Sequence, residues 1–157
     1  MNEVSLSPMR GFHVYGGSAG MRFERLVNRS GEPVLSIDAA ARLGEQFDWA
    51  NKVVIQITPR EHPALMCTVL GLMAEFEANN HGPAKDKLFR LSNQPERGQM
   101  YARLQQGQQS FHLPITPDKV FQLGALGLHI LAEQVGMDTT SCLALLRATA
   151  GRLLAPR

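Results

Sequence analysis

Between residues 100 and 105, apolar side chains alternate with polar or aromatic ones: Met100, Ala102 and Leu104 against Tyr101, Arg103 and Gln105. This period-two alternation indicates a half-buried strand. It would place Tyr101 and Arg103 on one exposed face, where an arginine can fork onto a phosphate and a tyrosine ring can stack on a base. An ordinary solvated strand face explains the pattern equally well.

Other basic and aromatic residues lie in or beside segments that read as strands. With Tyr101 and Arg103, they make up the candidate nucleic-acid site: Arg22, Arg25, Lys85, Lys87, Arg90, Arg97 and Trp49. Trp49, the only tryptophan, is either a stacking platform or a core residue. Phe23 and Phe89 lie on the same segments, and we expect both in the core. Only the combination of cations and flat side chains favours single-strand binding.

The chemistry of an enzyme is weakly represented. The five histidines are scattered, no pair of them has the spacing of a zinc-binding helix, and Cys-x-x-Cys is absent. The glycine-rich segment 16–20 lacks the Lys-Ser/Thr ending of a phosphate loop, so we interpret it as a hairpin connection. Cys67 and Cys142 fall in apolar helical contexts and are expected to be buried thiols. We therefore expect no catalytic residue, no metal and no cofactor.

Two segments of the chain, 57–77 and 115–135, align without a gap at an offset of 58 residues, with seven identities in 21 positions. Each begins with Ile-Thr-Pro after a strand-like run. Threonine is a good N-cap, and proline is suited to the first helical position. Glu61 would complete a capping box with Thr58. We interpret each segment as a strand leading into a helix, with the first helix extending from residue 60 to 77, and the pair as an internal duplication.

The expected fold is α+β, a tandem duplication of an antiparallel sheet-plus-helix unit with three or four strands and then one helix, twice, followed by a short C-terminal helix. Segment 39–49 is open between a short helix and a long hairpin arm. The expected organisation is one intertwined domain: a flexible arm (1–9), a first repeat (10–81), a second repeat (82–137), and a C-terminal helix and tail (138–157). The helix is expected over residues 140–150, after an Asp138 or Thr139 cap.

Composition sets the outer limits of function. Hydrophobic residues make up 44 % and charged residues 19 %, as in globular proteins. The net charge of +2 is uneven: residues 1–80 sum to −2 and residues 81–157 to +4. This permits a nucleic-acid partner without requiring one. The start of the sequence lacks a signal-peptide pattern, and no apolar run is long enough to cross a membrane. We expect a soluble, cytoplasmic protein with no membrane partner.

From about Phe12 to Gly136, this architecture resembles the Whirly and positive-cofactor-four-like families, and also the Pur-alpha repeat family. The resemblance implies single-stranded nucleic-acid binding and assembly through helices. The plant Whirly motif Lys-Gly-Lys-Ala-Ala-Leu is missing, since segment 82–87 has two lysines but does not match it. The second half also lacks one strand of the family pattern, so no family residue can be transferred to a position here.

The hypothesis is a homo-oligomer, a dimer or tetramer, that binds single-stranded nucleic acid, DNA in preference to RNA, largely without regard to sequence. Basic and aromatic residues on the sheet faces would bind it. The alternative is an oligomerisation or scaffold module, in which the leucines of helix 140–150 contact another subunit. A small enzyme with an unrecognised site is the least favoured interpretation.

Overall fold

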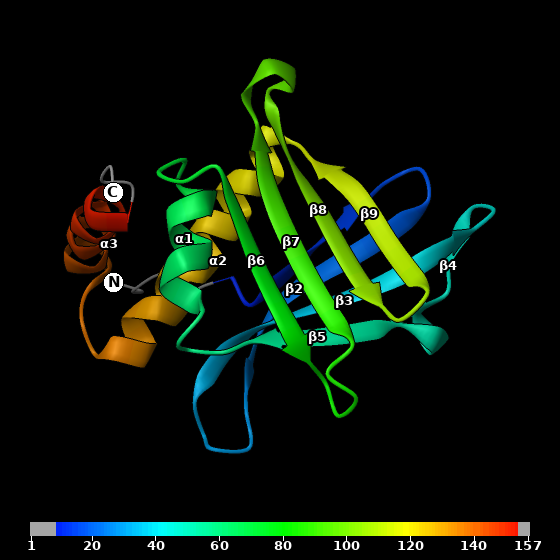
Figure 1. The fold of residues 1–157 in the computed structure, drawn as a ribbon, viewed down its shortest axis with the longest axis horizontal. Coiled ribbons are helices and arrows are strands. Elements are labelled where there is room, and N and C mark those ends of the chain that lie inside the picture. The colour runs from blue at the N-terminus through cyan, green and yellow to red at the C-terminus, as the bar shows by residue number, and fades with distance from the viewer. Residues whose placement is uncertain (1–8, 154–157) are drawn as a thin grey trace, which may run out of the picture.

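The computed structural model describes residues 9–153 and contains two antiparallel sheets and three α-helices (Figure 1), which confirms the α+β class. The arm expected at residues 1–9 falls outside the described residues up to position 8. The strands are β1 (Gly11–Tyr15), β2 (Ala19–Val27), β3 (Pro33–Leu43), β4 (Gln46–Phe47), β5 (Val53–Ile57), β6 (Glu75–His81), β7 (Lys87–Gln94), β8 (Gln99–Gln106) and β9 (Gln109–Ile115). The helices are α1 (His62–Val69), α2 (Pro117–Val135) and α3 (Thr139–Leu153), with short 3₁₀ turns at Trp49–Asn51 and Pro95–Arg97.

The first sheet contains β1 to β5. Its order is β1-β2-β3, with β5 on the other side of β3 and the short β4 paired with the end of β3. Segment 39–49, open from the sequence, is a hairpin arm. Strand β3 extends to Leu43, the chain turns at Gly44 with φ +67°, and Phe47 pairs back with Arg42.

The second sheet has the order β6-β7-β8-β9, and its first strand contradicts the sequence-based prediction. The helix expected over residues 60–77 covers only 62–69, and Gly71 follows it with φ +77°. Phe76 and Ala78 are then buried at period two in β6. The apolar residues of this segment therefore fit both helical and strand spacing. Gly71, with its positive φ, follows the end of the helix. The strand that the second half lacked is β6, so the second sheet begins at Glu75 and not at residue 82.

The two Ile-Thr-Pro junctions share a conformation only at their start. Ile57 and Ile115 each end a strand. At the first junction the capping-box bonds form: Glu61 N donates to Thr58 Oγ1 (3.2 Å) and Thr58 N donates to Glu61 Oε1 (3.0 Å). The helix nevertheless begins later than expected, at His62, with Glu61 and not Thr58 as its N-cap. At the second, Thr116 is the N-cap but its hydroxyl bonds Asp118 instead of a backbone N–H. Beyond residue 69 the aligned segments diverge into strand and helix, so the duplication stays an interpretation of the sequence.

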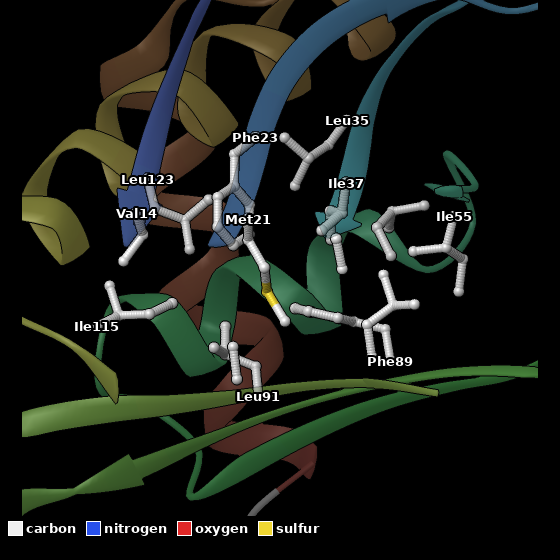
Figure 2. Packing of buried hydrophobic residues seen from close by; sticks show 14 of the residues in the cluster. Val14, Met21, Phe23, Leu35, Ile37, Ile55, Phe89, Leu91, Ile115 and Leu123 are labelled. Atoms are coloured by element: carbon white, nitrogen blue, oxygen red, sulfur yellow. The ribbon is translucent and has the colours of Figure 1, made fainter. Parts of the chain in front are cut away.

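The core lies between the inner faces of the two sheets and beneath α2. Figure 2 shows Met21, Phe23 and Ile37 of the first sheet facing Phe89 and Leu91 of the second. Phe23 and Phe89 are fully buried, as expected. Because both inner faces are used in this core, a ligand can meet the sheets only on their outer faces. On β3 even the outward side chains are buried: Val34, Ser36, Asp38 and Ala40.

The helices gather at one end of the molecule (Figure 1). The α1 and α2 helices meet closely at Gly127, where an added Cβ would lie 2.4 Å from the sulfur of Met66. Gly136 ends α2 with φ +67°, as expected. Asp138 then accepts a hydrogen bond from Ser141 N (2.8 Å), as expected for the cap of the next helix. Helix α3 continues to Leu153 instead of ending near Gly151, which itself adopts helical geometry.

Cys67 and Cys142 are free and buried between the helices, where burial raises the pKa of both thiols. None of the helices in residues 9–153 is long and apolar enough to cross a membrane.

Candidate nucleic-acid interface

Strand β8 presents the alternation expected from the sequence. Met100, Ala102 and Leu104 are buried in the core. Tyr101 and Arg103 point to the outer face of the second sheet, where Arg103 is exposed and Tyr101 half-buried. The most regular pattern in the sequence thus places an aromatic ring and a guanidinium on one solvent-facing surface.

A row of charged and polar side chains crosses this outer face. In register across β6 to β9 it consists of Glu77, Arg90, Arg103 and His112. Arg90 is neutralised, because its Nε and Nη2 donate to Glu77 Oε2 at 3.2 and 2.9 Å. Arg103 donates through Nε to Ser110 Oγ (3.1 Å), and no carboxylate in the described part of the chain pairs with it. Its guanidinium therefore keeps donors for an anion.

Tyr101 and His112 form a pair next to Arg103. The Tyr101 hydroxyl and His112 Nδ1 lie 2.6 Å apart, and the rings are stacked with centroids separated by 5.9 Å. With the ring proton on Nε2, the tyrosine hydroxyl donates to Nδ1, and the Nε2–H group can donate to a ligand. Tyr101, Arg103 and His112, which we call the β8–β9 cluster, thus combine a free cation, two flat rings and a hydrogen-bond donor.

The outer face of the first sheet contains a different group, the aromatic cluster: His13, Tyr15, Phe47 and Trp49. The Tyr15 ring lies 5.7 Å from His13 and 4.9 Å from Phe47, and Trp49 lies 5.5 Å from His13, all between centroids. Tyr15 is 59 % exposed. Trp49 is half-buried within this cluster, so it is neither isolated on the surface nor part of the inner core.

Gly20 on β2 makes room for the aromatic cluster. An added Cβ there would lie 3.0 Å from Phe47 Cδ1 and 3.3 Å from Tyr15 Cδ1. Its neighbour on β3 is Ala40, another small residue. The two rings therefore pack closely over the backbone at the start of β2, because no larger side chain stands beneath them.

Arginines on the first face are already engaged. Arg22 forms an ion pair with Glu24 at 2.9 Å. Arg42 donates to the carbonyls of Gly44 and Gly16 at 2.8 and 3.3 Å, and its guanidinium carbon lies 5.8 Å from the centre of the Phe47 ring. This face therefore offers rings more than free positive charge.

Two predicted contact residues point away from the outer faces. Arg25 faces the helices, where Nε and Nη2 donate to the carboxylate of Glu133 at 2.9 and 2.7 Å. This hydrogen bonding raises the pKa of Arg25 and lowers the pKa of Glu133. Lys87 points inward and donates through Nζ to the carbonyl of Val54 at 2.7 Å. The position of each residue in its strand, and not its charge, decides which way the side chain points.

The last two predicted residues lie in turns at opposite ends of β7. Lys85 is exposed in the β6–β7 connection with φ +54°. Arg97 lies in the 3₁₀ turn between β7 and β8, beside a groove of about 470 Å³ that Tyr101 also lines. Arg97 therefore extends the β8–β9 cluster, whereas Lys85 lies at the far edge of the same sheet.

Segment 16–20, Gly-Gly-Ser-Ala-Gly, matches the Gly-x-Ser-x-Gly spacing of a hydrolase nucleophile motif. It forms the turn between antiparallel strands β1 and β2, whereas the nucleophile elbow requires a strand followed by a helix. Within residues 9–153, no group of three His, Cys, Asp or Glu side chains is placed to bind a metal ion.

Sequence reasoning missed His13, Phe47, Arg42 and His112. Counting back from the two-residue hairpin at residues 107–108 gives the pairing of Arg103 with His112. His112 could therefore have been predicted from the sequence. The aromatic cluster needed the β3–β4 arm, which the sequence left undecided between helix and hairpin.

The fold has a known counterpart. No protein-family model and no curated protein matched the chain. Among solved structures, it is similar to the plant transcriptional regulator PBF-2, with a TM-score of 0.60 and 17 % identity over 98 % of this chain and 100 % of that one. The similarity supports the Whirly-like fold expected from the sequence.

Proposed function

We propose that this chain binds single-stranded nucleic acid, DNA in preference to RNA, across the outer faces of its two sheets and with weak sequence preference. The observation that supports this most is the β8–β9 cluster. Arg103 has no carboxylate partner among the described residues and stands beside the stacked rings of Tyr101 and His112. The Whirly-like fold, shared with a protein described as a transcriptional regulator, agrees with it.

The two faces would contribute different contacts. Arg103 donates two N–H groups to a phosphate, and Arg97 adds a second cation at the edge of the sheet. Tyr101 and His112 offer a flat surface to a neighbouring base. On the first face, Tyr15 and Phe47 offer the same to a base farther along the strand. These contacts address phosphates and the faces of bases, which all bases have, so the expected sequence preference is weak.

Binding of a labelled single-stranded oligonucleotide to the full chain tests the proposal. We expect a dissociation constant of about micromolar or tighter at low salt, weakening steeply as salt rises because phosphate contacts release counterions. Duplex DNA should compete poorly, because its bases are stacked internally. If the fluorescence anisotropy of the oligonucleotide does not change at a large excess of protein, the proposed function is wrong.

A second proposal concerns assembly, on the surface of α1 and α2. Phe121 is 78 % exposed and lies beside an apolar groove of about 470 Å³ whose lining includes Val69, Val120 and Leu128. Such a surface is typical of a subunit contact. The sequence placed this contact on the leucines of residues 140–150 instead; of these, Leu146 is buried against the chain's own helices, whereas Leu145 is 53 % exposed. Light scattering of Phe121→Asp against the unmodified chain tests a homo-oligomer.

A cytoplasmic location remains part of the proposal.

A further inference from the structure

Three sheet edges contain features that oppose the addition of another strand. On β9, Pro114 has no N–H, and the pairing register turns its backbone away from β8. The β6 strand is interrupted by a register shift between Ala78 and His81. On β5, the carbonyl of Val54 already accepts a hydrogen bond from Lys87. Proline, bulges and engaged backbone groups are the usual protections of exposed edges.

Strand β1 has none of these protections. The bonds from Arg25 N to Arg10 O and from Gly16 N to Ala19 O, both 2.8 Å, fix which residues pair with β2. Because antiparallel pairs alternate, the N–H and C=O groups of Gly11, His13 and Tyr15 point to the open side. Within residues 9–153 these groups have no hydrogen-bond partner.

The open side of β1 borders a groove of about 650 Å³. Its opposite wall consists of Pro114, Thr116, Lys119 and Gln122, from the end of β9 and the first turns of α2. Figure 2 shows Val14 of β1 facing Ile115 and Leu123 of the same two elements. The Oε1 atom of Gln122 is buried and has no hydrogen-bond donor among the described residues. The groove thus has unsatisfied backbone groups on one wall and an unsatisfied acceptor on the other.

We propose that the β1 edge binds an extended, acidic peptide segment of a partner protein as an added strand. Its backbone would pair with Gly11, His13 and Tyr15, an amide or hydroxyl would donate to Gln122 Oε1, and a carboxylate would pair with Lys119. No described carboxylate lies within ion-pair distance of Lys119.

The opposite wall of the groove decides between a lone peptide and a second copy of the chain. Strands in a sheet lie about 4.8 Å apart, so the β1 strand of a second copy would bring its own β2 into the space beyond it. The end of β9 and the first turns of α2 already occupy that space. A single strand brings no second strand with it, so this wall does not exclude it in the same way.

Selection of random displayed peptides on the full chain supplies the probe, and the variants His13→Pro and His13→Ala test how it binds. Proline at 13 removes the outward N–H, and its φ is tolerated in an edge strand. Both variants lose the imidazole that contacts Tyr15 and Trp49, so only the N–H distinguishes them. We expect His13→Pro to weaken a selected peptide about tenfold or more, whereas His13→Ala, which keeps the N–H, changes affinity little. Equal losses in both variants, or a selection without a saturable binder, would overturn the proposal.

Amide exchange measured by NMR gives a second, independent readout. In the free protein the amides of Gly11, His13 and Tyr15 should exchange fast and those of Phe12 and Val14 slowly. The peptide should slow the first three selectively. If those three amides are already slow without peptide, or stay fast in the complex, strand addition does not occur. If an oligonucleotide slows them and peptides do not, the groove binds nucleic acid, which also contradicts the proposal.

Discussion

The outer faces of the two sheets offer different chemistry to a ligand on the same kind of scaffold. The first presents the aromatic cluster over Gly20, and its arginines are engaged with Glu24, with backbone carbonyls and with Phe47. The second presents Arg103 without a carboxylate partner in the described chain, together with one tyrosine and one histidine. The first face is thus suited to stacking and the second to binding charge as well. A ligand that uses both would depend on salt mainly through the second face.

The largest effect is expected on the second face. Tyr101→Ala with Arg103→Ala removes a stacking surface and a phosphate donor, and should weaken oligonucleotide binding about 30-fold or more. Both side chains point outward, so circular dichroism and the melting temperature should stay unchanged. Arg147→Ala, on an exposed position of α3, is the charge-matched control and should bind as the unmodified chain does. If both variants lose the same affinity, the loss reflects overall charge and not contacts on the second face.

The first face should contribute less, and without salt dependence. Tyr15→Ala with Trp49→Ala is expected to weaken binding about tenfold while the slope of log K against log salt stays the same. Arg103→Ala alone should lower that slope by about one. Anisotropy titrations over a series of salt concentrations separate the two. A changed slope in the aromatic variant would mean that the division between the faces is wrong.

A smaller effect is expected beneath the aromatic cluster. Gly20→Ala places a Cβ 3.0 Å from the Phe47 ring and 3.3 Å from Tyr15. The rings must tilt away from the sheet, so affinity should fall about threefold, within the range of a partly lost stacking contact. Gly17→Ala, where a Cβ meets nothing within 4 Å, is the control. If the two variants bind alike, the geometry of the cluster does not matter for the ligand.

The smallest effect concerns the helical layer and neither sheet face. His62 is fully buried, its Nε2 lies 2.8 Å from the carbonyl of Gly127, and burial lowers its pKa. The unfolded chain binds this proton more readily than the folded one, so stability falls as pH drops below the unfolded pKa of about 6.5. We expect the free energy of unfolding to decrease from pH 7 to pH 5.5. Denaturant melts should show a smaller loss for His62→Gln, and an identical loss would assign the pH effect to other groups.

The sequence predicted the parts of the site that depend on local alternation. The burial of Met100 and the exposure of Arg103 follow from period two alone. It placed Arg25 and Lys87 among the contact residues, but both point away from the outer faces, because a cation near the end of a strand lies on the inner or outer face according to the register. Strand β6 was missed because Leu72, Met73 and Phe76 also fit a helix. The aromatic cluster joins residues from β1 and the β3–β4 arm, and tertiary pairing of that kind has no local signal.

The most direct test of the central claim is an NMR titration of the labelled chain with a single-stranded oligonucleotide at low salt. The account predicts saturable shifts for Tyr101, Arg103 and His112, with a second group at Tyr15 and Trp49, and none on the exposed side of α3. Shifts confined to the helices, or none at a ligand excess, would contradict binding on the sheet faces.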